Sequence, residues 1–389
     1  MFATADWNDP YWTNKQHCAA ELARQGWRVL YVESVGFRAP HANSRRDWSR
    51  LWQRCKTGLR SLLIGASEVR QNIWTLSPLA IPAAHHLPFV GWLNHVLLRF
   101  MLRRFVKTHR FKAPLIWTYH PYMLDAIAPI AHRALLYHCV DDLAAIPGID
   151  AAAFRAAEEK LLRQADVVFA TAEPLAERCR QFNPNTHFLP NVVDAEHFGR
   201  ALQPGPIPDD LAAIPEPRLV YHGVLSDFKV DFALLLKAAK LRPDWHWVLI
   251  GEEREGQKSE LLGQLAKLPN VHLLGYRPYE VLPDYLRGMQ VGLLPTKIND
   301  YTRSMFPMKY FEYLAAGLPV VGTRLEFTKT SDYSFEQAEN IEEFVQRIGH
   351  QLISIEEQSS FDGENTWLTR TRTMLENVSC FAERVRVNQ

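Results

Sequence analysis

The sequence contains no apolar run long enough to cross a membrane. A spanning helix needs roughly 20 consecutive, mainly apolar residues, and the longest candidate, residues 87–105, is interrupted by one asparagine, one histidine and three arginines. Residues 1–7 have neither the basic segment nor the apolar segment of a secretion signal. We therefore expect a cytoplasmic protein.

Cysteine is also scarce. The five cysteines are scattered, odd in number and never spaced as Cys-x-x-Cys, which argues against a disulfide framework or a zinc site. No Asp-x-Asp motif stands at the end of a predicted strand. We therefore expect no metal ion and no cofactor.

The formal net charge is only +1, but the charges are unevenly distributed. Residues 41–112 contain thirteen Lys and Arg residues against two carboxylates, Asp47 and Glu68, a surplus of eleven positive charges. Aromatic and basic residues alternate here at helical spacing. Such a segment could contact an anionic membrane, bind RNA, or form a solvated basic rim. We prefer peripheral contact with the inner face of a membrane, and we expect no nucleic acid, because no nucleic-acid-binding module is recognisable.

Apolar, β-branched runs alternate with amphipathic helical segments along the whole chain, and 389 residues exceed the usual size of one domain. Continuously apolar strands separated by helices indicate parallel sheets covered on both faces. The sequence therefore predicts two doubly wound, Rossmann-like α/β domains facing a central cleft. The strands expected in the first domain are Arg28–Glu33, Ile73–Leu76, Leu115–Tyr119, Ala134–Val140, Asp166–Thr171 and His187–Pro190. Those expected in the second are Arg218–His222, His246–Gly251, Val271–Gly275, Val291–Leu294 and Pro319–Gly322.

The boundary between the domains is expected in a segment rich in proline. Residues 200–217 contain five prolines and a glycine, a composition that disfavours helix and strand. We therefore predict a first domain over residues 1–199, a linker over 200–217 and a second domain over 218–365. Residues 366–389 are expected to form a last helix that crosses back to the first domain.

The most informative motif is Pro-Met-Lys-Tyr-Phe-Glu-Tyr-Leu-Ala-Ala-Gly-Leu-Pro-Val-Val, residues 307–321. It predicts a helix that starts near Pro307 and stops at Gly317, followed by a buried strand. Backbone N–H groups at such a helix start can bind a diphosphate. Glu312 lies on the same side of the helix as Lys309 and could accept both hydroxyls of a ribose, although an ordinary solvated Lys–Glu pair has the same spacing.

This motif resembles the donor site of retaining GT-B glycosyltransferases of family 4. Glu312 matches the residue that binds the nucleotide ribose in that family. A second Glu usually stands eight residues earlier, where this chain has Ser304. In this respect the chain is more similar to a subgroup of polysaccharide and teichuronic-acid-type transferases with the pattern P-x-K-x-x-E-Y-x-A-A-G. Arg303 and Ser304 are then candidates for contact with the transferred sugar.

The resemblance extends to other donor-site segments. Gly223 ends a strand, and Lys229 matches a family lysine on the diphosphate, although a lone lysine after a strand is often simply solvated. Val224 replaces the family arginine, so Arg303 or Lys309 is a candidate for the second charge. Tyr276 and Arg277 belong to a turn whose backbone reads the nucleotide base in the family. The resemblance implies a nucleoside-diphosphate sugar, with UDP or GDP as the nucleotide.

The first domain is expected to hold a sugar or lipid-linked acceptor. His120 aligns with a family histidine near the transferred sugar, although a histidine at a strand end is often structural. Trp12 and Asn14 lie in a loop expected at the carboxyl end of the first strand. Asp141 and Asp142 could orient the acceptor hydroxyl or cap the next helix.

These features predict a glycosyltransferase that acts with retention of configuration in polysaccharide or glycolipid assembly. In that role His120, Lys229 and Glu312 are the catalytic candidates. Two alternatives remain open: a sugar-nucleotide epimerase or hydrolase of the same fold, and a degenerate transferase that serves as a scaffold.

Overall fold

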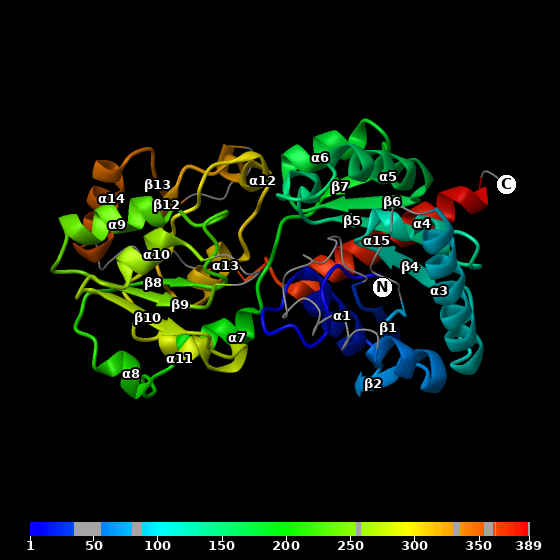
Figure 1. Cartoon of the computed structure of the whole chain (residues 1–389), viewed down its shortest axis with the longest axis horizontal. Coiled ribbons are helices and arrows are strands. Elements are labelled where there is room, and N and C mark those ends of the chain that lie inside the picture. Colours follow the sequence, from blue (N-terminus) through cyan, green and yellow to red (C-terminus); the bar gives the residue numbers. More distant parts are fainter. Residues whose placement is uncertain are drawn as a thin grey trace. The chain divides into compact units, whose positions relative to one another are not determined.

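The structure is a computed structural model that describes residues 1–34, 56–79, 88–253, 258–329, 335–353, 361 and 363–387. The chain divides into two compact units (Figure 1). Unit 1 comprises Met1–Pro190 and Arg370–Gln389, and unit 2 comprises Asn191–Thr369. Of the basic segment, residues 41–55 and 80–87 lie outside the described residues. No helix in the described ranges is both long and apolar enough to span a bilayer.

Unit 1 is built on two groups of strands that the amino terminus joins. The first group has the order β1-β3-β2 and the second the order β4-β5-β6-β7. Phe2 forms parallel bridges to Val32 on one side and Thr118 on the other, so the chain start lies between β1 and β4. β2 pairs antiparallel with β3, and the other pairs are parallel. The strands are β1 (Val29–Val32), β2 (Ser67–Arg70), β3 (Ile73–Leu76), β4 (Leu115–Thr118), β5 (Ala134–Cys139), β6 (Val167–Ala170) and β7 (Thr186–Phe188).

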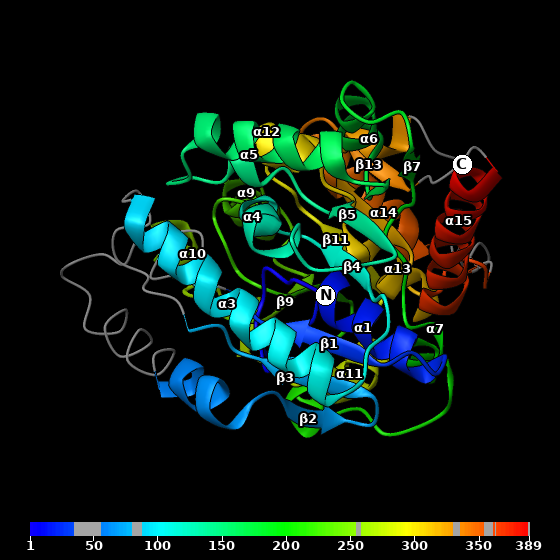
Figure 2. The same ribbon diagram turned by 90° about the vertical axis from the view of Figure 1, so that its right-hand side faces the viewer.

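The last helix is anchored in unit 1 by a buried arginine. The Arg370 guanidinium donates to Asn14 Oδ1 at 2.6 Å and to the Leu189 carbonyl at 3.1 Å, and it lies 3.0 Å from His138 Nε2. The unit 1 helices are α1 (Asn14–Arg24), residues 56–64, α3 (Pro88–Thr108), η1 (Pro121–Met123), α4 (Leu124–Ile127), η2 (Leu143–Ala145), α5 (Ala151–Gln164), α6 (Glu173–Arg180) and α15 (Trp367–Val387). Figure 2 shows α3 on the outside of this unit.

Unit 2 contains a six-stranded sheet in the order β10-β9-β8-β11-β12-β13. All of its strand pairs are parallel. The chain proceeds outward in one direction from β8 and then returns to start again at β11, so the point between β8 and β11 is the topological switch point. The strands are β8 (Arg218–His222), β9 (His246–Ile250), β10 (Val271–Gly275), β11 (Val291–Leu294), β12 (Val320–Thr323) and β13 (Glu336–Ala338).

Alternate residues of these strands enter two different cores. On β8, Leu219 and Tyr221 pack with α9 and α14, whereas Val220 packs on the opposite face with α11 and α13. Since successive side chains of a strand point to opposite faces, His222 shares the face of Val220. The unit 2 helices are α7 (Ala195–Gly199), η3 (Arg200–Leu202), α8 (Asp209–Ala212), α9 (Phe232–Leu241), α10 (Glu260–Leu265), η4 (Tyr279–Val281), α11 (Leu282–Leu286), α12 (Asp300–Arg303), α13 (Met308–Ala315), η5 (Glu326–Lys329) and α14 (Ile341–Ile353).

The predicted fold class is confirmed, and the eleven predicted strands are present. The position of the domain boundary differs from the prediction. The change of unit falls between Pro190 and Asn191, and residues 200–217 are not a bare linker, because they form η3 and α8 and bury Ala201, Leu211 and Ile214 in a core of unit 2. The apolar side chains of this segment therefore anchor it in unit 2.

The backbones at the carboxyl ends of β8 and β9 come very close together. The Gly223 N–H donates to the Ile250 carbonyl at 2.8 Å. Gly251 has φ +151°, and a Cβ on it would lie 1.8 Å from the Gly223 carbonyl oxygen. Only glycine allows this conformation and this approach.

We predict that Gly251→Ala destabilises the protein by about 2 kcal/mol or more, because the backbone must move to relieve the overlap. Gly263 on α10 is the matched control, since a Cβ there meets nothing within 4 Å. Gly263→Ala should stabilise the helix by about 0.5–1 kcal/mol. Urea unfolding of both variants measures the difference, and equal midpoints would contradict the prediction.

Candidate functional site

Backbone hydrogen bonds join the loops that follow β8 and β11 across the switch point of unit 2. The Asp231 N–H donates to the Pro295 carbonyl and the Lys297 N–H donates to the Lys229 carbonyl, both at 2.8 Å. Ligands of doubly wound sheets bind outside the carboxyl ends of the strands at such a point. The topology alone therefore directs attention to the groups around Gly223 and Lys229.

A tyrosine of α13 fixes that helix against the sheet. A Cβ on Gly292 of β11 would lie 2.5 Å from the Tyr313 ring, so the ring lies directly on the strand. The Tyr313 hydroxyl accepts from the His222 N–H and donates to the Val220 carbonyl, each at 3.3 Å. These contacts hold α13 at the end of β8 and place the neighbouring Glu312 beside His222.

Three ionisable side chains and a glycine meet at the end of β8, and we call them the Gly223 cluster: His222, Gly223, Lys309 and Glu312. Glu312 Oε2 lies 3.3 Å from His222 Nε2, and both residues are buried. Gly223 has φ +120°, and a Cβ on it would lie 2.8 Å from Lys309 Nζ. The ammonium group of Lys309 therefore occupies the space that a side chain at position 223 would fill.

Burial controls the ionisation of this cluster. It raises the pKa of Glu312 to about 7, against the opposing effect of the Lys309 charge. Burial and the Lys309 charge lower the pKa of His222 to about 3. The pKa of Lys309 is also lowered by burial, an effect that Glu312 opposes. At neutral pH the imidazole is therefore uncharged, and Glu312 is close to its titration midpoint.

Aromatic rings lie next to the cluster. The Phe198 ring centroid is 6.3 Å from that of His222 and 5.5 Å from that of Tyr279. The Tyr279 ring stacks on His197 at 4.1 Å. Burial, followed by the Glu312 charge, raises the pKa of Tyr279, so its hydroxyl stays protonated at neutral pH.

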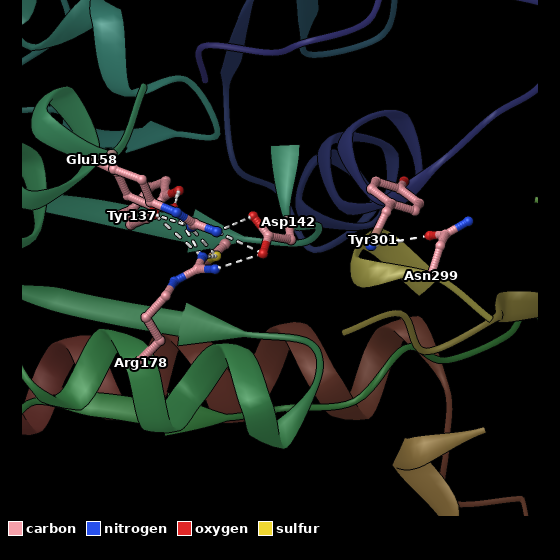
Figure 3. Close-up of polar contacts among 8 residues, drawn as sticks. Tyr137, Asp142, Glu158, Arg178, Asn299 and Tyr301 are labelled. Carbon is pink, nitrogen blue, oxygen red and sulfur yellow. Dashed lines mark hydrogen bonds and ion pairs between the residues drawn. The ribbon is translucent and has the colours of Figure 1, made fainter. Parts of the chain in front are cut away.

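Lys229 lies in the loop after β8, where it contacts Tyr301. Its Nζ atom donates to the Tyr301 hydroxyl at 3.2 Å. Asn299 fixes the neighbouring turn (Figure 3), because its Oδ1 accepts from the N–H of Tyr301 at 3.1 Å while its Nδ2 donates to the Phe228 carbonyl at 2.7 Å. Hydrogen bonds therefore hold in place both the loop after β8 and the loop after β11.

The other donor-side candidates lie in different surroundings. Arg277 donates to Asp210 and to the Tyr285 hydroxyl, both at 2.6 Å, so its guanidinium ties α8 to α11. Arg303 is exposed and pairs with Asp300 at 3.4 Å. Ser304 ends α12, and Tyr276 is half-buried directly after β10.

In unit 1, Asp142 belongs to a buried ion network rather than to an open acceptor site (Figure 3). Arg155 donates to both of its carboxylate oxygens at 2.6 and 2.7 Å, and Arg178 pairs with it at 3.1 Å. The same arginines pair with Glu158, which also accepts from the Tyr137 hydroxyl. Asp142 neither caps η2 with its side chain nor presents an uncommitted carboxylate. The expected capping contact is therefore absent, and contact with an acceptor hydroxyl stays a prediction.

The remaining acceptor-side candidates are placed as follows. Asn14 is buried and accepts from Arg370, so its contact is structural. Trp12 is half-buried, with the Arg70 guanidinium 4.7 Å from its ring centroid. Asp141 is half-buried directly after β5. His120 is buried after β4, where its N–H donates to Thr118 Oγ1 at 3.0 Å.

The structure thus brings together Gly223, Lys309 and Glu312, three of the residues expected on the donor side. The sequence analysis did not single out His222, Gly251 or Tyr279. His222 and Gly251 carried a usable signal, since a polar residue and a glycine each stand at the end of an apolar strand. Tyr279 carried none, because its position next to Glu312 depends on how the turn after β10 folds.

Part of the chain is similar to known proteins. The model of the family described as glycosyl transferases group 1 matches residues 216–352. TuaH of Bacillus subtilis (strain 168), named as a teichuronic acid biosynthesis glycosyltransferase, is 30% identical over 198 residues. The match covers 48% of this chain and 47% of TuaH, so the chain spans about half the length of this curated relative.

Solved structures share the fold over nearly the whole chain. Anabaena Alr3699/HepE, in complex with UDP and glucose, has a TM-score of 0.62 and 16% identity, with 100% of this chain and 98% of that chain covered. Sucrose-phosphate synthase of Thermosynechococcus elongatus has a TM-score of 0.61 and 16% identity, with 95% and 90% covered. The chain therefore shares the GT-B fold class, with two Rossmann-like units, and residues 216–352, which contain the whole Gly223 cluster, match the glycosyl transferases group 1 family.

Proposed function

We propose that the chain is a glycosyltransferase that moves a sugar from a nucleoside diphosphate to an acceptor hydroxyl. The observation that carries the proposal is the Gly223 cluster at the switch point of unit 2. It offers a carboxylate and an ammonium group beside a glycine, within the segment that matches the family. A nucleoside diphosphate has complementary groups: ribose hydroxyls for Glu312 and a diphosphate for Lys309.

The proposed donor site extends over both loops of the switch point. Lys229 and the N-terminal end of α13 would add positive charge next to the diphosphate. Ser304, Arg303 and Tyr276 remain proposals for contacts with the sugar and the base, whereas the pairing of Arg277 with Asp210 favours a supporting role for Arg277. We propose UDP or GDP as the nucleotide; the complex of HepE with UDP and glucose supports UDP.

The proposed transfer retains the anomeric configuration and needs no nucleophile from the protein. The acceptor oxygen forms a bond to the anomeric carbon as the bond from that carbon to the diphosphate oxygen breaks. The electron pair stays with the diphosphate, which takes the hydroxyl proton on the same face. Lys229 and Lys309 would balance the charge that develops on the leaving group, without a metal ion, and His120 would orient the sugar.

We further propose that the acceptor is a sugar or a lipid-linked sugar in polysaccharide or glycolipid assembly. The partial match to TuaH, named for teichuronic acid biosynthesis, supports this setting. A lipid-linked acceptor would require the protein, as a cytoplasmic enzyme, to contact the inner face of a membrane, and the basic residues 41–112 support such contact.

The direct test is a calorimetric screen of UDP, GDP, dTDP and CMP and their sugars against the full chain. We expect one nucleoside diphosphate and its sugar to bind, and the bound sugar to be transferred when an acceptor is supplied. Conversion of the sugar nucleotide without an acceptor would instead identify an epimerase or hydrolase. Binding of none of the nucleotides would contradict the proposal.

We predict that Lys229→Ala and Lys309→Met each lower turnover at least about tenfold. Each change removes a positive charge that would stabilise the negative charge developing on the leaving diphosphate. Lys240→Met on the exposed end of α9 is the matched control and should leave turnover unchanged. Thermal unfolding should show that Lys309→Met remains folded, since burying an ammonium group is itself unfavourable. Wild-type turnover in both the Lys229 and the Lys309 variant would show that neither lysine takes part in the reaction.

Donor affinity should depend on pH through Glu312. The ionised carboxylate accepts the ribose hydroxyls, and the pKa of Glu312 is raised by burial to about 7. UDP-glucose, whose diphosphate keeps its charge in this range, should therefore bind about tenfold more weakly at about pH 6 than above about pH 8. Glu312→Gln should bind weakly at every pH. The same pH dependence in wild type and variant would assign the titration to another group.

A further inference from the structure

A pocket of about 570 Å³ in unit 1 lies at the opposite edge of the sheet from the candidate acceptor residues. The end of α3, the turn after it and the loop before β5 form its walls. Lys112 comes just before β4, and Ala131 comes just before β5, so the pocket is at the amino ends of these strands. His120 and Asp141 follow the carboxyl ends of the same strands. The pocket is therefore separate from the proposed reaction.

The lining of the pocket is cationic and apolar. It contains four basic residues and no carboxylate: Arg103, Lys107, Arg110 and Lys112. In the described parts of the chain these four side chains form no ion pair or side-chain hydrogen bond. The other lining residues are Val106, Phe111, Pro129, Ile130 and Ala131. A group of cations without counterions, set against apolar walls, fits an anionic group attached to hydrocarbon.

Arg110 occupies a backbone position that favours glycine. Its φ is +52°, and the Phe111 N–H donates to the Val106 carbonyl while the Arg110 N–H donates to that of Lys107. This is the Schellman ending of a helix, in which the left-handed residue is usually glycine. An arginine is less stable than glycine in this conformation, so the fold gains nothing from it here, and a role in binding explains its presence.

The exposed face of α3 continues from the pocket as an apolar stripe. Trp92, Phe100 and Val96 are 59%, 56% and 36% exposed. At 3.6 residues per turn, these three side chains and those of Arg103 and Lys107 fall within about 80° around the helix axis. One face of α3 therefore presents large apolar side chains from Trp92 to Phe100 and cations from Arg103 to Lys107.

The helix of residues 56–64 adds to this surface. Leu63 and Ile64 are each 67% exposed, and Arg104 of α3 holds this helix by donating to the carbonyls of Leu62 and Leu63. Exposed aliphatic and aromatic residues beside unpaired cations are typical of a surface that enters the interface of an anionic bilayer. Nucleic acid would match the cations but not the apolar stripe.

We propose that this pocket binds the phosphate group of an anionic membrane lipid while the stripe of α3 enters the bilayer interface. The proposal rests on the membrane contact proposed above and gives it a site. It does not depend on the transfer reaction. The pocket would fix one edge of unit 1 on the membrane and leave the carboxyl edge of its sheet for the acceptor.

The test uses the full chain and vesicles made either of phosphatidylcholine alone or of phosphatidylcholine and phosphatidylglycerol in equal amounts. We compare Arg110→Gly with Ala113→Gly, because Ala113 also has a positive φ, of 42°. Both changes place a glycine at a positive φ and so relieve backbone strain, but only Arg110→Gly removes a cation. Arg110→Gly should keep or raise the melting temperature and weaken sedimentation with the anionic vesicles about fivefold, whereas Ala113→Gly should bind like wild type.

A second variant tests the apolar stripe. Phe100→Ser should weaken binding to the anionic vesicles, and nucleotide binding by all of these variants should stay at the wild-type level. Nucleotide binding thus separates a failure of the proposed lipid site from a failure of the proposed transferase function. Equal vesicle binding by Arg110→Gly and Ala113→Gly would overturn the lipid site. So would loss of binding to inorganic phosphate in Arg110→Gly without loss of vesicle binding, or binding of an RNA oligonucleotide in place of vesicles.

Discussion

The candidate site of unit 2 depends on the absence of side chains at the carboxyl ends of β8 and β9. Gly251 lets its backbone come closer to that of Gly223 than any Cβ would allow. The space over Gly223 is then filled from outside the sheet by Lys309. Because Gly292 lets Tyr313 lie flat on β11 and bond to β8, α13 has one position along the sheet. Glycines in the strands thus determine where the charged groups of a helix are held.

The contacts among the ionisable groups of the Gly223 cluster do not compensate for the cost of burying their charged forms. Burial raises the pKa of Glu312 and lowers the pKa values of His222 and Lys309, so it favours the uncharged form of each group. The attraction between Lys309 and Glu312 only partly opposes this effect. A cluster that served stability alone would be more favourable with apolar residues of similar volume. A ligand that brings hydroxyls to the carboxylate and negative charge to the ammonium would favour the ionised forms of both. Perturbed ionisation at a topological switch point is therefore better explained by binding than by folding.

The fold could be predicted from the sequence because each predicted strand is a continuous apolar run with a distinct end. β2 (Ser67–Arg70) and β13 (Glu336–Ala338) were missed, since both are short and mostly polar. The motif around Glu312 predicted Lys309 on the same side of the helix, and the resemblance named Gly223 as a further donor-side residue. The surroundings of Asp142 and Arg277 could not be predicted for a common reason: their partners, Arg178 and Asp210, lie 36 and 67 residues away in the chain. Spacing reveals which residues share a helix face, but not which distant charge will neutralise them.

The sheet of unit 1 also explains how surface contact and chemistry could coexist in one domain. In a parallel sheet all loops of one kind gather at one edge, and β5, with six residues, separates the two edges by about 20 Å. His120 and Asp141 lie at one edge, and the pocket with Arg110 lies at the other. Cations that attract an anionic surface at one edge therefore lie more than a Debye length of about 8 Å from the other. The positive charge of the pocket would be screened from the acceptor side, so the two edges can be tuned independently by substitution.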